Sequence, residues 1–249
     1  TRYWRDWSSD VCSSDLEPSR GPLGITALEL IEQTLEAADE PMTLVATGPL
    51  TNIADVIERL PHLHDRIEEV VIMGGAVDLG NWTPAAEFNI WVDPHAADIV
   101  FGAACPPDGP RTGIPLTMIG LEVTHRAWLD DAHADALRTC GPVGAFVAEL
   151  LDHFVGFHQE RFGWPGAPIH DAVTIAHLID PTLVEVLPMS VRIETESPLC
   201  IGRTVCDRWG VMDERPNAAV GLDIDRDRFV TLLVGRLAEL GTRGPASRR

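Results

Sequence analysis

The sequence predicts an α/β fold: a mainly parallel, Rossmann-like open sheet flanked by helices, with an antiparallel extension. Short apolar segments alternate with segments of helical periodicity through the first half of the chain. Loops that contain glycine or proline separate these segments. Segments of alternating polarity then cluster towards the carboxyl end, which predicts paired strands added to the parallel part.

The first half supplies three predicted strands and three predicted helices. Helical spacing relates Leu28, Leu30, Ile31, Leu35 and Ala38, which predicts an amphipathic helix. The next elements, in chain order, are a strand over 42–46, a helix that opens at the 47–52 turn and runs through Leu60, a strand over 69–73, a helix from Asp93 to about Ala103, a surface loop over 105–113 and a strand over 115–120.

The second half is richer in helices. Helical patterns cover 130–139, 144–162, 170–178 and 225–240, and alternation over 184–194 and 200–206 predicts paired strands. Since neither a repeat nor a linker is evident, we expect one domain over 17–249. Residues 1–16 have no apolar signal-peptide core, and we interpret them as a non-native leader, with a native disordered arm as the alternative.

The charge balance excludes some partners. The chain has 38 acidic and 19 basic residues and a formal net charge of −19. Nucleic acid and anionic membranes require a basic surface, so we expect neither as a partner. The five cysteines include no CxxC pair, which disfavours a disulfide framework or a zinc site and favours a cytoplasmic location.

A polar loop follows one of the predicted strands directly. The apolar run 70–73 ends in Gly74-Gly75, and Asn81, Glu87 and Asn89 come next. Loops at strand ends of an α/β sheet are common ligand sites. Carboxamides both donate to and accept from hydroxyl groups, and a carboxylate accepts from them, so this loop predicts a ligand with several hydroxyls.

Three further segments contain candidate polar groups: Thr47-Gly48, Thr124-His125 and the 168–171 stretch with His170 and Asp171. A carboxylate at a helix start is often only a cap, whereas the adjacent histidine favours a functional role because it transfers protons near neutral pH. Trp82 is expected either to pack as an ordinary aromatic side chain or to stack on a ligand.

Taken in order, these motifs resemble those of the inosine–uridine nucleoside hydrolases. The resemblance extends from about Glu17 to Leu240. Its motifs are 47–52, Met73-Gly74-Gly75, 81–89, Asp93-Pro94, His170-Asp171, Glu194-Thr195 and Gly202-Arg203-Thr204. It implies the nucleoside hydrolase fold and calcium-assisted cleavage of the N-ribosidic bond, which yields ribose and a free base.

The resemblance also implies roles for individual residues. Asn81, Glu87 and Asn89 would hold ribose hydroxyls, with Met73 beside the sugar and Trp82 in the same pocket. The Thr47 backbone carbonyl and the Asp171 carboxylate would bind Ca²⁺. His170 would lie near the leaving base, as the candidate catalytic acid or as a contact to the base, and His158 would line the base pocket. The segment 154–171 resembles the pyrimidine-preferring members, although these residues leave the base preference undecided.

One family motif has no match in this sequence. The family begins with an Asp-x-Asp-x-Gly-x-Asp-Asp segment that supplies most calcium ligands and the general base. Thr47 and Asp171 provide two protein oxygens for an ion that prefers six to eight. We therefore expect a domain that lacks its N-terminal strand and Asp-rich motif, an incomplete calcium site, and weak or absent activity.

Two other functions stay open. A non-catalytic protein that binds ribose or nucleosides would keep Asn81, Glu87 and Asn89 without the metal site. A metal-dependent hydrolase with another substrate is the third possibility. The family resemblance further implies a homo-oligomer, a dimer or a tetramer.

Overall fold

The computed structural model describes residues 21–104 and 113–242. The predicted leader at 1–16 and most of the predicted 105–113 loop lie outside these residues. The chain divides into two compact units. The sheet unit comprises Thr26–Ala127 and Ile169–Phe229, and the helical unit is formed around Trp128–Pro168 and the segment that begins at Val230.

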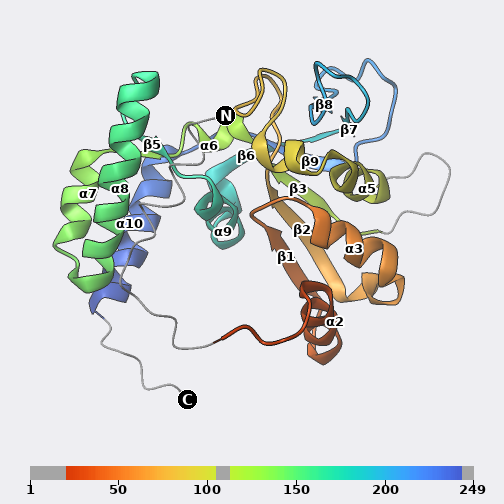
Figure 1. The fold of residues 1–249 in the computed structure, drawn as a ribbon, viewed down its shortest axis with the longest axis horizontal. Coiled ribbons are helices and arrows are strands. Elements are labelled where there is room, and N and C mark those ends of the chain that lie inside the picture. Colours follow the sequence, from red (N-terminus) through yellow and green to blue (C-terminus); the bar gives the residue numbers. More distant parts are fainter. Residues whose placement is uncertain (1–20, 105–112, 243–249) are drawn as a thin grey trace. The chain divides into compact units, whose positions relative to one another are not determined.

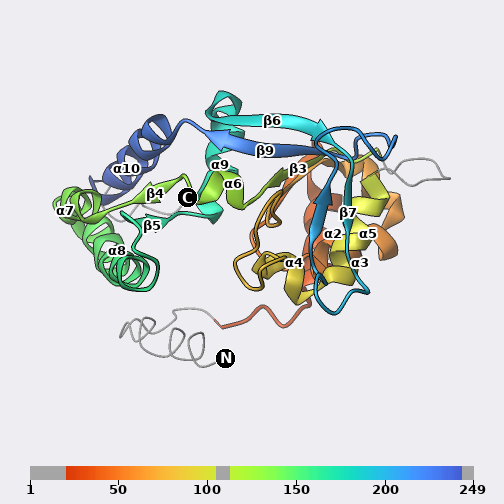
Figure 2. The same ribbon diagram turned by 90° about the horizontal axis from the view of Figure 1, so that it is seen from above.

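A five-stranded sheet in the order β1-β2-β3-β9-β6 forms the centre of the sheet unit. The first four strands are parallel to their neighbours, and β6 is antiparallel to β9, as Figures 1 and 2 show. The predicted fold class is confirmed. The strands are β1 Met42–Ala46, β2 Ile67–Met73, β3 Leu116–Ile119, β6 Val184–Met189 and β9 Ala218–Ile224.

Helices cover both faces of this sheet. In Figures 1 and 2, α9 lies on one side of β2, and α2, α3 and α5 lie on the other. The helices of the sheet unit are α2 Ala27–Ala37, α3 Thr51–Arg59, η1 Pro61–Arg66, α4 Phe88–Val92, α5 Pro94–Ala104, α6 Leu121–Thr124, α9 Asp171–Ile179 and η2 Pro181–Leu183. Burial on both faces explains why β2 ends in the uninterrupted buried run Val70–Met73.

Local sequence signals fix where several helices begin. Thr26 and Glu29 form a capping box at α2, in which the Glu29 amide donates to Thr26 Oγ1 at 3.2 Å and the Thr26 amide donates to Glu29 Oε2 at 2.7 Å. At α5, Asp93 Oδ1 accepts from the Ala96 amide at 3.0 Å, and Pro94 occupies the first helical position. These signals agree with the predicted helix starts.

The strands near the carboxyl end pair differently from the prediction. The predicted segment 184–194 divides at Ser190 into β6 and β7, and only β7, Val191–Ile193, pairs with β8, Thr204–Cys206. Its first part, β6, instead pairs with β9, a strand that the sequence pattern did not predict. Gly221 allows β9 to enter the sheet, because a Cβ there would lie 2.8 Å from Val123 Cγ2.

Among the described residues, the helical unit contains three helices and a short strand pair. Its elements are β4 Trp128–Leu129, α7 Asp131–Arg138, α8 Gly141–Phe162, β5 Ala167–Pro168 and most of α10 Arg226–Thr242. Asp130 caps α7, and Gly163 ends α8 with a φ of 66°. Within the described ranges, no helix is long and apolar enough to cross a bilayer.

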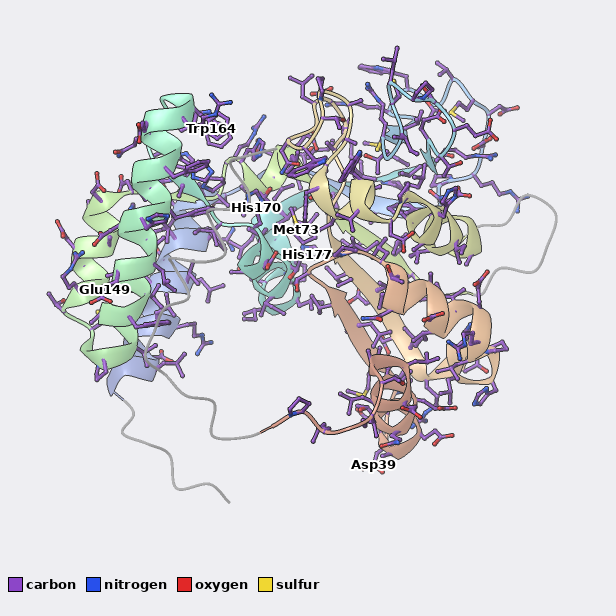
Figure 3. All side chains as sticks on the ribbon, in the orientation of Figure 1. Asp39, Met73, Glu149, Trp164, His170 and His177 are labelled. Atoms are coloured by element: carbon purple, nitrogen blue, oxygen red, sulfur yellow. The ribbon has the colours of Figure 1, made fainter. Side chains whose placement is uncertain are left out.

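His177 on α9 is a buried histidine, with 9% of its surface exposed (Figure 3). No described residue forms a hydrogen bond with its Nδ1 atom. Burial lowers the pKa of His177, and the charge of Glu69 opposes that shift only partly. The unfolded chain binds a proton near pH 6.5 while the folded chain resists it, so stability is lost as the pH falls below about 6.5.

Replacing His177 with leucine should therefore weaken the acid sensitivity of the fold. We expect His177→Leu to lose less free energy of unfolding than the wild type between pH 7 and pH 5, as measured by urea denaturation at both values. The control is His95→Leu, at an exposed position on α5. Equal losses in the wild type and His177→Leu would contradict the assignment.

Candidate active site

The candidate site lies at the carboxyl ends of β1, β2 and β3. The parallel register pairs Ala46 with Ile72 and Met73 with Ile119. The loops that follow these strands therefore leave the sheet at the same edge, where α/β proteins usually bind ligands. Thr47, the 74–87 loop and α6 all begin at this edge.

Glu87 is the most buried charged group of the site, with 3% of its surface exposed. It caps α4: Oε1 accepts from the Asn89 amide at 2.9 Å, and Oε2 accepts from the amides of Gly75 at 3.0 Å and Ile90 at 3.2 Å. A carboxylate has about four acceptor positions, so these bonds leave capacity for one ligand hydroxyl. Glu87 therefore both fixes the backbone and retains an acceptor.

Hydrogen bonds of two carboxamide side chains fix three residues that lie near Glu87 in the sequence: Met73, Asn81 and Asn89. Asn89 Nδ2 donates to the Met73 carbonyl at 3.0 Å and contacts Met73 Sδ at 3.5 Å. Asn81 Oδ1 accepts from the Phe88 amide at 3.0 Å. The Asn89 carboxamide oxygen thus has accepting capacity, and the Asn81 amino group has donating capacity, as a vicinal diol requires.

Electrostatics link the 81–89 loop to the start of α9. Burial raises the pKa of Glu87, three backbone amides lower it, and the Asp171 charge raises it further. Asp171 is exposed, yet the protein around it removes enough water to raise the pKa of its carboxyl as well. The two carboxylates predicted for different parts of the site therefore interact with each other.

His170 lies directly before α9 (Figure 3), and α6 holds its side chain. Its Nδ1 atom lies 2.9 Å from the hydroxyl of the fully buried Thr124, and its ring meets His125 edge-on at 5.9 Å. The Ile169 amide donates to the Ala127 carbonyl at 2.8 Å, which aligns the two segments. The structure thus brings together the Thr124-His125 and His170-Asp171 segments that the sequence left separate.

The described residues provide only part of the oxygen coordination shell that a Ca²⁺ ion needs. Thr47 follows β1 at the site edge, and Asp171 starts α9. In the part of the chain that is described, the one group of three clustered ligand atoms is Glu32, Glu36 and His62. It lies on α2 and η1, and η1 leads into the amino end of β2, opposite the site. Thr47 and Asp171 fit a calcium site in chemistry, but two oxygens do not complete one.

The two aromatic candidates occupy different surroundings. Trp82 packs against Phe88 at 5.2 Å and Trp91 at 5.1 Å between ring centroids, so it helps to hold the 81–89 loop. His158 belongs to the helical unit, where its Nδ1 lies 2.8 Å from the Phe154 carbonyl. Burial lowers the pKa of His158. Its contact with a base stays a prediction.

Sequence comparison identifies the family to which this site belongs. The profile described as inosine-uridine preferring nucleoside hydrolase matches residues 10–231. The chain belongs to this nucleoside hydrolase family. A pyrimidine-specific ribonucleoside hydrolase, RihA, from Enterobacter sp. is 47% identical over 229 residues, which cover 91% of this chain and 70% of the relative. RihA from Citrobacter koseri is 48% identical over 224 residues, 89% of this chain and 69% of the relative.

Solved structures agree with this nucleoside hydrolase assignment. A purine-preferring ribonucleoside hydrolase from Gardnerella vaginalis superposes with a TM-score of 0.79 at 32% identity, covering 91% of this chain and 71% of that one. A plant nucleoside hydrolase gives a TM-score of 0.79 at 26% identity, with coverages of 92% and 72%. This nucleoside hydrolase accordingly cleaves ribonucleosides to ribose and free base.

Proposed function

We propose that this nucleoside hydrolase prefers pyrimidine ribonucleosides such as uridine and cytidine. The observation that supports this substrate class is the 47–48% identity to relatives described as pyrimidine-specific, against 32% for the purine-preferring Gardnerella vaginalis enzyme. We also propose that the site binds the ribose of these substrates. The support for this is that Asn81, Glu87 and Asn89 come together at one edge of the sheet.

Glu87 and the two carboxamides would hold the ribose. The Asn81 amino group would donate to one hydroxyl, while Asn89 Oδ1 and Glu87 would accept from hydroxyls. Cleavage of the N-ribosidic bond develops positive charge on the sugar ring, as in other glycosyl transfers. A buried carboxylate at Glu87 would stabilise that charge, because water does not screen it there.

His170 would supply the proton that the departing base needs. Its contact with the Thr124 hydroxyl supports a fixed ring orientation. General acid catalysis of this kind contributes about 10²–10⁴-fold to rate. His170→Asn should therefore lower kcat by about 10²-fold or more, whereas His95→Asn, an exposed histidine on α5, should leave kcat unchanged.

The experiment that tests the function is a steady-state assay with uridine, cytidine and inosine. Ribose is measured as reducing sugar, and the free base is measured by chromatography. We expect kcat/KM for uridine to exceed that for inosine by about tenfold or more. Comparable values would overturn the pyrimidine preference, and equal kcat in the wild type and His170→Asn would overturn the role of His170.

The Asp171 carboxylate and the Thr47 backbone carbonyl would provide part of the oxygen coordination shell of a Ca²⁺ ion. A bound Ca²⁺ would supply a more acidic water molecule and an anchor for sugar hydroxyls. Asp171 is suited to this because its carboxyl is partly desolvated and close enough to Glu87 to affect it electrostatically. A cation held by Asp171 would offset the repulsion that its charge exerts on Glu87.

Removing the Asp171 carboxylate should weaken calcium binding. We expect Asp171→Asn to raise the calcium dissociation constant by about tenfold, because one full negative charge leaves the site. Isothermal titration calorimetry measures this, with Asp55→Asn on α3 as the control. An unchanged constant would exclude Asp171 as a ligand. The same titration tests the expectation that this chain binds calcium weakly, and the uridine assay tests the expectation that it turns over slowly.

Location and assembly stay predictions. The expected cytoplasmic location and homo-oligomer rest on cysteine usage and on the family resemblance. Light scattering of the purified chain tests assembly, and a monomeric mass at assay concentration would contradict a dimer or tetramer.

A further inference from the structure

The turn that follows β2 has an unusual set of backbone partners. Each of its five consecutive amides donates to a group from elsewhere in the sheet unit. The acceptors are the Ile119 carbonyl for Gly74 at 3.2 Å, Glu87 Oε2 for Gly75 at 3.0 Å, Thr204 Oγ1 for Ala76 at 2.9 Å, and Glu122 Oε1 for Val77 and Asp78 at 2.9 Å each. Glu87 was assigned to the sugar above, whereas Glu122 and Thr204 have no assigned role.

Glu122 belongs to α6 and binds the turn with a single oxygen. Oε1 accepts from two successive amides, and bonds to a charged acceptor are stronger than neutral ones. The other oxygen, Oε2, is buried and has no hydrogen-bond partner among the described residues. The absence of a side chain at Gly120 admits this carboxylate, because a Cβ there would lie 3.1 Å from Oε2 and 2.9 Å from the Gly75 carbonyl.

Thr204 holds the same turn from β8. Its hydroxyl accepts from the Ala76 amide at 2.9 Å and donates to the Ala76 carbonyl at 2.5 Å, so it satisfies both backbone groups of one residue. Only 2% of its surface is exposed. Gly75, with a φ of 77°, leaves room for Thr204, since a Cβ there would lie 2.9 Å from Thr204 Cγ2.

We propose that Glu122 and Thr204 are positioning residues for ribose recognition. They fix the turn that joins Met73, which binds Asn89, to the loop that begins with Asn81. Neither residue is assigned a contact with the sugar or the base. Their effect should therefore appear in sugar affinity and not in the rate of bond cleavage. This inference rests on the proposed ribose-binding role of the 81–89 loop.

Four variants test the proposal. Glu122→Ala and Thr204→Val should each raise KM for uridine and the inhibition constant of free ribose by about tenfold, with kcat within about threefold of wild type, as expected when lost hydrogen bonds affect ground-state and transition-state binding equally. Hydrogen exchange of a peptide covering 74–80 should accelerate in both. Thr204→Ser keeps the hydroxyl and Glu122→Gln keeps one acceptor oxygen, so both should retain most of the affinity.

The outcomes separate this proposal from the proposed function. If the wild type neither cleaves uridine nor binds ribose, the proposed function fails, while exchange over 74–80 still reports on the turn. If the wild type is active but KM and exchange are unchanged in Glu122→Ala and Thr204→Val, the positioning role is overturned. A loss confined to kcat also overturns it. Glu185→Ala, at an exposed position on β6, is the control. If the larger truncations fail to fold, Glu122→Gln and Thr204→Ser are compared instead, and a rise in KM without faster exchange over 74–80 overturns the positioning role.

Discussion

Glu87→Gln is expected to abolish most activity and to destabilise the fold. The glutamine amino group would replace one carboxylate oxygen, so at least one of the amides of Gly75, Asn89 and Ile90 would lose its acceptor in a buried site. Bonds to charged groups and unsatisfied buried donors each contribute about 1–3 kcal/mol, so we expect a loss of about 2–4 kcal/mol in unfolding free energy. Loss of the charge near the sugar should lower kcat by about 10²-fold or more.

Urea denaturation and the uridine assay measure the two effects separately. Glu58→Gln, an exposed carboxylate on α3, is the matched control and should change neither quantity. Wild-type stability in Glu87→Gln would show that the three amide bonds are not important for the fold. A wild-type kcat in Glu87→Gln would exclude a role for Glu87 in bond cleavage.

Gly80→Ala, directly before the 81–89 loop, is expected to be a damaging change to the turn from which this loop starts. A Cβ at Gly80 would lie 2.3 Å from both the amide nitrogen and the carbonyl oxygen of Ala86, and 2.4 Å from the Thr83 carbonyl oxygen. These are backbone atoms of a closed turn in which Gly80 donates to Pro84 and Trp82 donates to Ala86, each at 3.2 Å. The turn must open to accept a methyl group, which we expect to cost about 3 kcal/mol.

Opening this turn would displace Asn81 and with it one donor to the sugar. KM for uridine should rise by about tenfold or more in Gly80→Ala, and the melting temperature should fall. Gly102→Ala in α5 is the matched control, since apart from its chain neighbours and its own helix backbone no described atom lies within 4 Å of its added Cβ, and alanine favours a helix by about 0.5–1 kcal/mol. A melting temperature that rises in both variants would contradict the described turn.

Periodicity predicted the elements that have strong local signals. The parallel strands β1, β2 and β3 and the long helices are continuous apolar or amphipathic segments with recognisable starts. β9 was missed because Gly221 and Asp223 interrupt its apolar run, although it lies between β3 and β6 in the sheet. Its place depends on the Met118 carbonyl of β3 and on the side chains of Val123 and Val184 around Gly221, which no local pattern contains.

The candidate site likewise combines residues that have a local sequence signal with contacts that have none. Recognisable motifs in the sequence led to the proposed roles of Asn81, Glu87, Asn89, His170 and Asp171, and these roles stay predictions. Sequence alone did not reveal that Glu87 caps α4 or that Thr124 contacts His170, since the second contact joins residues 46 positions apart. Glu122 and Thr204 were missed as functional residues because their partners are backbone amides, which have no sequence signature.

The Ala76–Thr204 bond joins residues 128 positions apart, and Glu122 reaches Val77 across 45. Closing such long loops costs chain entropy, so these bonds should form only after most of the sheet unit has assembled. During refolding from urea, ribose binding should therefore return no earlier than the slowest phase seen by circular dichroism. A newly synthesised chain would likewise lack sugar affinity until β8 had left the ribosome, whatever the state of the strands made before it.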